Sequence, residues 1–136
     1  MATLLRLRSS PRVDYLGWLF ISTRGRIPRS TYWAAKLGLL FTLVVVLATS
    51  VAVAPTNARG DPPGWVWLPL IPYLFAIVAV AIKRLHDRDM SGWWVLVCLV
   101  PYLGELFSLI VLGCLKGTEG SNDYGPDPLK PEAAET

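Results

Sequence analysis

Charged residues are nearly absent from the middle of this 136-residue chain. Between Leu37 and Leu115 they occur only in two short loops, with the single exception of Glu105. A helix of a soluble domain carries a polar face opposite its apolar stripe, because one side meets water and the other meets the core. The distribution therefore excludes an ordinary soluble domain and predicts segments that lie in lipid.

Histidine and cysteine are also scarce. One histidine, His86, excludes a two-histidine metal site within a protomer, and neither Cys98 nor Cys114 belongs to a CxxC motif. On one helix, sixteen residues would separate the two cysteines by about 24 Å, which no disulfide can bridge. We therefore predict no metal site, no cofactor and no catalytic residues, and we expect both cysteines to pack as small apolar side chains.

Three apolar stretches fill the middle of the chain, at residues 37–54, 65–82 and 93–115. As helices they would extend roughly 27, 27 and 34 Å, close to the ~30 Å hydrocarbon core of a bilayer. A helix satisfies its own backbone polar groups and is the simplest structure that can cross lipid. The sequence predicts an all-α, polytopic membrane protein with three transmembrane helices at about 32–54, 65–83 and 92–116.

The remaining segments are expected to complete a single membrane domain, residues 13–128. A basic leader, residues 1–12, precedes an aromatic stretch at 13–21 that is too short to span lipid and has basic residues on both sides. This pattern predicts a short interfacial helix. Glycine and proline at 117–128 predict a turn-rich cap, and residues 129–136 are expected to be a disordered tail.

The basic residues predict the orientation. Seven of them precede the first span and three lie in the second loop, whereas the first loop contains only Arg59. By the positive-inside rule, the N-terminus and the second loop face the cytoplasm of a multi-pass protein. Three crossings would then place the C-terminus outside. An alternative keeps it inside: Pro101 and Gly104 could break the third segment into a re-entrant pair.

Three motifs resemble those of one family. Residues 25–33 resemble a G-R-x-x-R-x-x-[YF]-W motif before a first span. Residues 84–94 resemble an R-L-H-D-x-x-x-S-G-W-W loop, and residues 117–128 resemble a G-T-x-G-x-N-x-[FY]-G-P-D-P tail. Together they resemble the bacterial inner-membrane family catalogued as domain of unknown function 805, which implies a small plasma-membrane protein and supplies no activity. The motif residues are Gly25, Arg26, Arg29, Tyr32, Trp33, Arg84, His86, Asp87, Ser91, Gly92, Trp93, Trp94, Asn122, Gly125, Pro126 and Asp127.

Basic residues near the predicted membrane surface are candidates for lipid binding. Each such cation contributes on the order of 1 kcal/mol toward anionic lipid. The alternative is that this charge only fixes the topology. The candidate lipid-headgroup residues are Arg26, Arg29, Lys83, Arg84 and Arg88.

Two further positions have a structural and a functional interpretation. Glu105 would lie near mid-membrane, where a carboxylate costs at least ~2.5 kcal/mol, so it is either an ion or proton site or a protonated group bonded inside the bundle. His86 could titrate near neutral pH beside Asp87. We favour a structural role for that pair, with Asp87 bound to nearby arginines.

The function predicted from these features is non-enzymatic. We expect an interaction or envelope protein whose basic face binds membrane lipids, anionic ones above all, and which does not bind nucleic acid. Small residues at Ala34, Gly38 and Thr42 would allow self-association or packing against a membrane-protein partner. The alternative function is an oligomeric transporter or channel component that uses Glu105.

Overall fold

The computed structural model describes residues 11–57 and 60–130, and this part of the chain is helical apart from turns and one isolated bridge. The all-α prediction is confirmed. The predicted leader up to residue 10 and the predicted disordered end at 131–136 lie outside the described residues. The elements are α1 (Pro11–Ile21), α2 (Arg29–Val53), η1 (Gly64–Trp67), α3 (Leu70–His86), η2 (Gly92–Leu99), α4 (Leu103–Phe107) and η3 (Ser108–Cys114).

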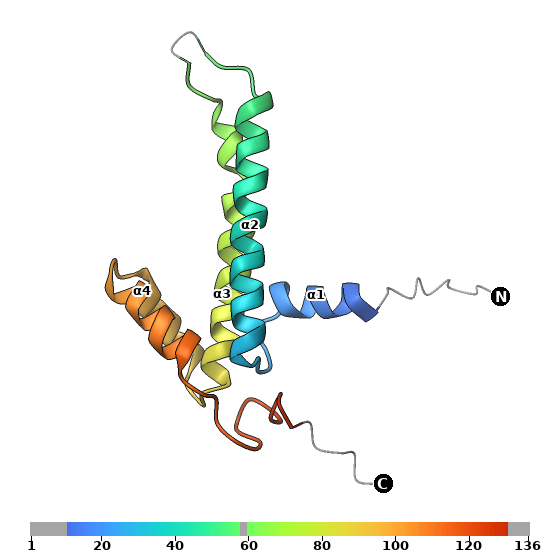
Figure 1. Cartoon of the computed structure of the whole chain (residues 1–136), viewed down its shortest axis with the longest axis vertical. Helices are drawn as coiled ribbons and strands as arrows, with labels where there is room; N and C mark the ends of the chain where they lie inside the picture. The colour runs from blue at the N-terminus through green and yellow to red at the C-terminus, as the bar shows by residue number, and fades with distance from the viewer. Residues whose placement is uncertain (1–10, 58–59, 131–136) are drawn as a thin grey trace, which may run out of the picture.

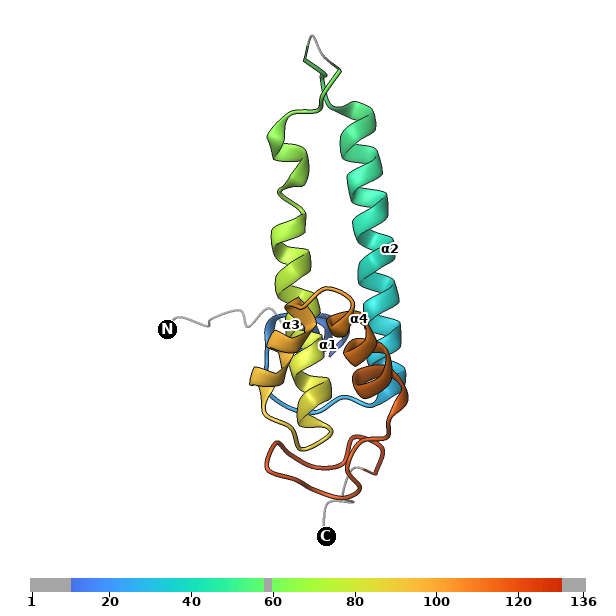
Figure 2. The same cartoon turned by 90° about the vertical axis from the view of Figure 1, so that its left-hand side faces the viewer.

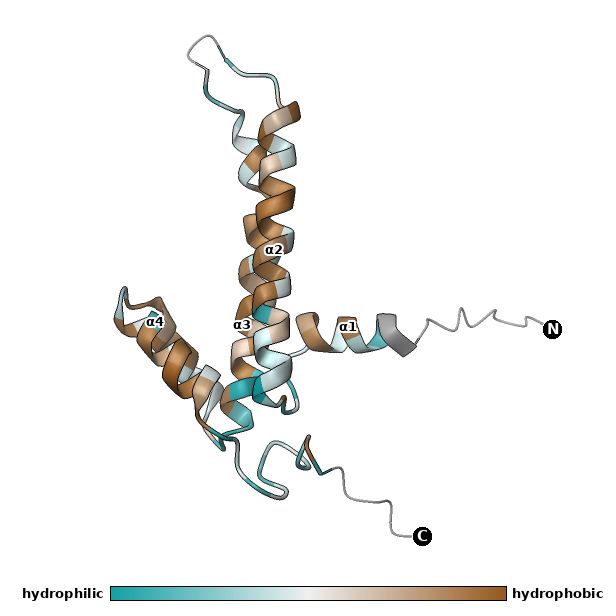
Figure 3. Ribbon diagram, in the orientation of Figure 1, coloured by the Kyte–Doolittle hydropathy of each residue, from teal (hydrophilic) through white to brown (hydrophobic). Residues whose placement is uncertain are grey.

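Two apolar helices run side by side in opposite directions (Figures 1 and 2). α2 has 25 residues, and η1 continues into α3 to give a second apolar unit of 23 residues, so both are long enough to cross a membrane. Their ribbons are hydrophobic over most of their length and hydrophilic where α2 begins and α3 ends (Figure 3). We call this end of the molecule the base. The most apolar part of α2 has no buried residue, so its surface suits lipid rather than water.

The third predicted crossing is wrong. Segment 92–114 is a hairpin in which η2 ends at Leu99, the chain reverses, and α4 and η3 lead back to the base. The first arm, η2, has 8 residues, and the second arm, α4 together with η3, has 12. They extend about 16 and 18 Å, well short of the ~30 Å of hydrocarbon. The segment folds back on itself as the re-entrant alternative expected, and the three-crossing argument that placed the C-terminus outside no longer applies.

The reversal has a local cause. Pro101 lacks the N–H that would continue η2. Tyr102 has φ 63° and ψ −52°, and the N–H of Leu103 donates to the Pro101 carbonyl at 2.7 Å, which is the geometry of a tight γ-turn. Gly104 then passes so close to η2 that a Cβ at this position would lie 2.4 Å from the carbonyl oxygen of Cys98. Hydropathy does not record these backbone constraints, so the sequence profile of 93–115 looks like one continuous span.

The core lies at the base, where α1, α2, α3 and η3 meet. α1 projects sideways from the α2–α3 pair, and the hairpin inclines away from the pair on another side (Figure 1). The predicted interfacial segment 13–21 is helical and begins two residues earlier than expected, at Pro11. The cluster of buried side chains consists of Leu19, Ile27, Tyr32, Ala35, Val80, Ala81, Leu85 and Leu112.

Candidate functional site

Five charged side chains are buried in the described part of the chain: Asp127 in the tail, and four that group around the end of α3. Arg26 comes from the α1–α2 linker, Lys83 and Arg84 from the last turn of α3, and Asp87 from the residue that ends α3. The exposed fractions are 5%, 0%, 1% and 3% in that order. A buried charge without partners is strongly destabilising, so the contacts of these groups decide the structure of the base.

Asp87 accepts from both buried arginines. Its Oδ1 lies 3.2 Å from Nη2 of Arg26, and its Oδ2 pairs with Nη1 of Arg84 one turn earlier on α3. Burial raises the pKa of the Asp87 carboxyl, and the guanidinium groups of Arg84 and Arg26 act in the opposite direction. Both arginines therefore stabilise the charged form of the buried Asp87 carboxyl.

Arg26 joins this cluster to the C-terminal tail. Its Nη1 donates to the carbonyl oxygens of Gly120, at 2.7 Å, and Gly125, at 3.1 Å. Its Nη2 donates to the carbonyl oxygen of Thr118 at 2.6 Å and to the hydroxyl of the same residue at 3.1 Å. One side chain thus holds the turns of the predicted 117–128 cap against the linker.

Arg84 joins the cluster to the hairpin. Its Nε donates to the carbonyl oxygen of Leu112 at 2.8 Å, and its Nη2 donates to that of Leu115 at 2.5 Å. Arg88 adds a bond to the carbonyl oxygen of Val111 at 3.2 Å. Carbonyls at the end of a helix lack intrahelical partners and carry partial negative charge, so two arginines are suitable donors there.

Lys83 binds the end of α1. Its Nζ donates to the carbonyl oxygens of Trp18, at 2.6 Å, Leu19, at 2.8 Å, and Ser22. An ammonium group has three donors, and these three bonds use all of them. The ammonium also lies 4.8 Å from the centre of the Trp18 ring, which adds a cation–π contact. The compact charge of lysine therefore fits this position.

The tail closes over the end of α3. The N–H of Thr118 donates to the Asp87 carbonyl at 2.8 Å, and the amide of Asn122 donates to the His86 carbonyl at 2.8 Å. The rings of His86 and Tyr124 stack with their centres 3.9 Å apart. A Cβ on Gly117 would lie 2.0 Å from Oδ2 of Asp87, so only glycine permits this approach.

The three sequence motifs thus meet in one place. Comparison of the sequence with known proteins identifies the family. The model of a family described as protein of unknown function (DUF805) matches residues 20–126. The chain belongs to this family.

Curated relatives of this DUF805 chain come from Escherichia coli (strain K12). The inner membrane protein YhaI is 36% identical over 110 residues, which cover 80% of this chain and 87% of the relative. The inner membrane protein YhaH is 34% identical over 116 residues, covering 80% and 88%. The uncharacterized protein YiiR is 32% identical over 134 residues, covering 81% and 87%. No solved structure matches. The DUF805 chain is therefore a bacterial inner-membrane protein.

Three of the five residues predicted to bind lipid headgroups do not face lipid in this DUF805 chain. The donors of Arg26, Lys83 and Arg84 are used by carbonyl groups and by Asp87, and all three side chains are buried. This part of the prediction is wrong, because charge placed near a membrane end was assumed to be on the surface. Only Arg29 is exposed, and Arg88 is half-buried.

Glu105 is not a buried acid. It lies on α4 with an exposed side chain, and within the described residues it forms no hydrogen bond or ion pair. The expectation of a mid-membrane carboxylate inside a bundle assumed three full crossings, and the hairpin removes that assumption. No group of three or more His, Cys, Asp or Glu side chains capable of holding a metal occurs in the described part of the chain.

The aromatic motif residues divide between the hairpin contact and the surface. Tyr32 shares a 2.8 Å hydrogen bond with the hydroxyl of Ser108, and Nε1 of Trp33 donates to the Gly113 carbonyl at 3.1 Å. Lys36 donates to the same Ser108 hydroxyl at 2.8 Å. These contacts were not predicted from the sequence, although the small residues at 108 and 113 indicate close packing. Ser91 accepts from the N–H of Trp93, while Gly92, Trp93, Trp94 and Pro126 are not buried.

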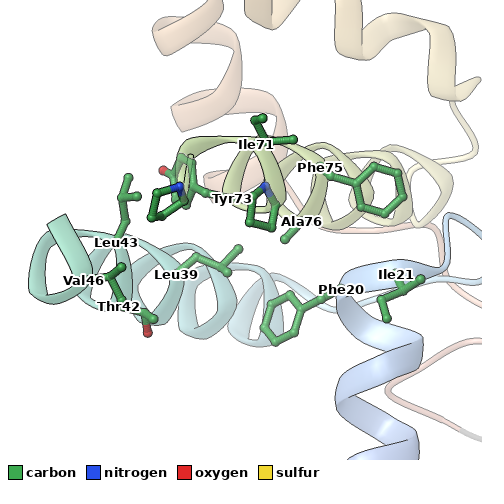
Figure 4. Close-up of a pocket in the computed structure, with 12 residues that line it drawn as sticks. Phe20, Ile21, Leu39, Thr42, Leu43, Val46, Ile71, Tyr73, Phe75 and Ala76 are labelled. Carbon is green, nitrogen blue, oxygen red and sulfur yellow. The ribbon is translucent and has the colours of Figure 1, made fainter. Parts of the chain in front are cut away.

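Two hollows complete the site. An apolar groove of about 650 Å³ lies between α2 and α3 and is bounded at one end by Phe20 and Ile21 of α1 (Figure 4). A smaller pocket of about 190 Å³ lies at the base, between the start of α2 and the tail, and has both polar and apolar walls. The groove is suited to hydrocarbon, whereas charged side chains line the pocket at the base.

Proposed function

We propose that this protein is a non-enzymatic membrane-interface protein. In this proposal α2 and α3 cross the inner membrane, and the base lies at its cytoplasmic surface, where it binds anionic lipid headgroups. The observation that carries the proposal is that exposed apolar residues of α1 and the hairpin and exposed cations occur together at one end of the molecule. The basic residues of the linker and the second loop support the cytoplasmic side.

The apolar surface of the base supports insertion into the nearer leaflet. α1 and the hairpin both project sideways from the α2–α3 pair (Figure 1). Trp93, Trp94 and Tyr102 are exposed on the hairpin, and Tyr15 and Leu16 are exposed on α1. Tryptophan and tyrosine prefer the headgroup region, and apolar helices of this length lie in it rather than across it.

Of the cations that the sequence suggested, Arg29 remains available, and Arg24 and Lys116 are added to it. Arg24, Arg29 and Lys116 have exposed side chains, and these form no hydrogen bond or ion pair within residues 11–57 and 60–130. At about 1 kcal/mol each, three such charges would favour anionic lipid by about 3 kcal/mol, or roughly 100-fold. Salt would weaken this attraction, because the groups are at the surface.

Lipid retention tests the proposal. The full chain is purified in detergent, and retained phosphatidylglycerol is measured by native mass spectrometry for the wild type and for the R24Q/R29Q/K116Q variant. We expect the variant to lose most of the bound lipid, because the neutral side chains no longer attract phosphate. K130Q is the matched control, since it removes an exposed cation from the far end of the tail. Equal retention by the wild type and the triple variant would refute lipid binding by this face.

The proposal also includes self-association through α2. Ala34, Gly38 and Thr42 are exposed on one side of this helix, and a Cβ on Gly38 would meet no atom within 4 Å. Small residues at this spacing allow close approach of a second helix in lipid. A conduit that uses Glu105 would require several copies, and no observation favours it over the interface role.

A further inference from the structure

The pocket at the base has the size of a small polar group. Its walls come from the start of α2, the end of α3 and the tail, and its volume is about 190 Å³. A water molecule occupies about 30 Å³ in the liquid, so the space corresponds to roughly six waters. Pockets for drug-sized ligands begin at about 300 Å³. A nucleotide is therefore too large, whereas a compact headgroup fragment fits.

The charges around this pocket divide into two groups. Arg84 and Asp87 line it but already form an ion pair with one another, and Asp87 also accepts from Arg26. Asp127 lines it too, and its carboxylate already accepts from the N–H groups of Gly120 and Leu129. Arg29, Lys116 and Glu119 line it as well, and their side chains have no hydrogen-bond or ion-pair partner in the described part of the chain. The pocket thus offers two cations and one carboxylate that the fold does not use.

We infer that this pocket binds a phosphoethanolamine group, with its phosphate on Arg29 and Lys116 and its ammonium on Glu119. A phosphodiester accepts charge-assisted hydrogen bonds from arginine and lysine, and a primary ammonium donates to a carboxylate. A phosphoglycerol group would also satisfy the two cations, but its hydroxyls are uncharged and would give Glu119 a weaker contact than an ammonium does. The pocket therefore favours a zwitterionic amine-bearing headgroup, in addition to the general attraction of the exposed cations for anionic lipid.

The position of the pocket favours a lipid as the source of this group. Arg29 is the first residue of α2, which is one of the two helices long enough to cross the membrane. Lys116 follows directly after the hairpin residue Leu115, whose carbonyl binds Arg84. Both cations thus lie where the proposed membrane surface would be, so this inference rests on the proposed function for the location of the base.

A competition between two lipids tests the inference. The full chain in detergent is given equal amounts of phosphatidylethanolamine and phosphatidylglycerol with identical acyl chains, and the bound ratio is read by native mass spectrometry. For E119Q we expect the ratio of bound phosphatidylethanolamine to phosphatidylglycerol to fall about tenfold, which is the effect of one charge-assisted contact. R29Q/K116Q should reduce retention of both lipids, because the phosphate is common to them.

D123N is the matched control for E119Q. Asp123 is an exposed acid in the same tail and does not line the pocket, so the lipid ratio should stay at the wild-type value. Hydrogen exchange over residues 117–128 verifies that the tail remains docked in each variant. An unchanged ratio in E119Q with a docked tail would overturn the inference.

A second arm separates the lipid from a soluble source of the same group. Glycerophosphoethanolamine is added at a large excess over the lipid, and bound phosphatidylethanolamine is measured again. Retention of the lipid supports a membrane ligand, whereas full displacement would mean that the site takes the free phosphodiester. If R24Q/R29Q/K116Q loses phosphatidylglycerol while E119Q has a normal ratio, the proposed function stands and the pocket inference fails.

Discussion

Asp87 is the residue on which the linker, the end of α3 and the tail converge. Its carboxylate accepts from Arg26 and Arg84, and its backbone carbonyl accepts from the N–H of Thr118. The arginines in turn bind the tail and the hairpin. Removing one acceptor therefore leaves two buried guanidinium groups short of a charge partner, which is more costly than losing a surface ion pair.

We predict that D87N destabilises the base by about 3–5 kcal/mol. In the described structure Asp87 is the only acid that pairs with Arg26 and Arg84, so its loss leaves both buried guanidinium groups without an anionic partner. The measurement is thermal unfolding in detergent together with hydrogen exchange of residues 117–128. D89N is the matched control: Asp89 is exposed and has φ 58°, a conformation that asparagine tolerates. Similar unfolding of D87N and wild type would contradict the role given to Asp87.

Titration of the Asp127 carboxyl group is expected to make docking of the tail depend on pH. Its carboxylate accepts from the N–H of Leu129 at 2.9 Å and from that of Gly120 at 3.2 Å. These bonds, with help from Arg26, lower the pKa of Asp127. A lowered folded-state pKa stabilises the docked tail above the unfolded value of about 3.9, and this contribution is lost as the pH falls through the folded-state pKa.

We therefore expect exchange protection of the 117–128 segment to decrease on acidification below about pH 4. In D127N this particular decrease should be absent, because the amide does not titrate, and protection should be lower at neutral pH. The experiment compares the two proteins over a pH series after correction for intrinsic exchange rates. An identical acid-induced loss in both would assign the pH dependence to other groups.

At the scale of elements, α2 and the hairpin illustrate opposite uses of glycine. A Cβ on Gly104 would lie 2.4 Å from Cys98, and one on Gly113 would lie 2.6 Å from Trp33, so both glycines permit close packing inside the chain. Gly38 has no such neighbour. A small residue without a close neighbour in its own chain is suited to packing against a second helix in lipid.

Substitution of Gly38 tests self-association. G38I should leave thermal unfolding nearly unchanged, because the added side chain meets open space within the chain. It should reduce association between labelled copies in vesicles, measured by energy transfer, because a bulky residue separates the helices. L37I is the control, since it keeps the volume of an exposed neighbour on the same helix. Equal association of G38I and L37I would show that this side of α2 is not an interface.

At the scale of the whole molecule, the hairpin decides where the C-terminal tail lies. Two crossings return the chain to its starting side, and the hydrogen bonds of Arg26 hold the tail beside the α1–α2 linker. The proposed orientation therefore places both the linker and the tail in the cytoplasm, contrary to the three-crossing topology. The loop between α2 and η1 would be the segment exposed on the outer surface.

Cysteine labelling in intact cells checks this topology. In a background in which Cys98 and Cys114 are replaced by alanine, we expect T56C to react with a membrane-impermeant maleimide and S121C to react only after the cells are permeabilised. Both positions are exposed, so access depends on the side of the membrane. Labelling of S121C in intact cells would instead support an outside tail.

Much of the arrangement could be predicted from residues that act locally. The apolar stretches identified α2 and α3, Gly117 and Gly125 marked the turns of the tail, and the pairing of Asp87 with nearby arginines was the favoured interpretation. The environment of Arg26 and Lys83 could not be predicted in this way. Their acceptors lie 61 to 99 residues away for Arg26 and 61 to 65 residues away for Lys83.

The sequence by itself determined that the protein belongs in a membrane, because only long, uncharged and apolar helices are stable across lipid and such segments can be recognised from hydropathy. It also determined that three motifs carry the family resemblance. Only the tertiary structure decided that the third segment folds back at Pro101–Tyr102 and that most of the motif cations are buried. A turn depends on backbone geometry and burial depends on distant acceptors, and neither is encoded in the charge or hydropathy of a single stretch.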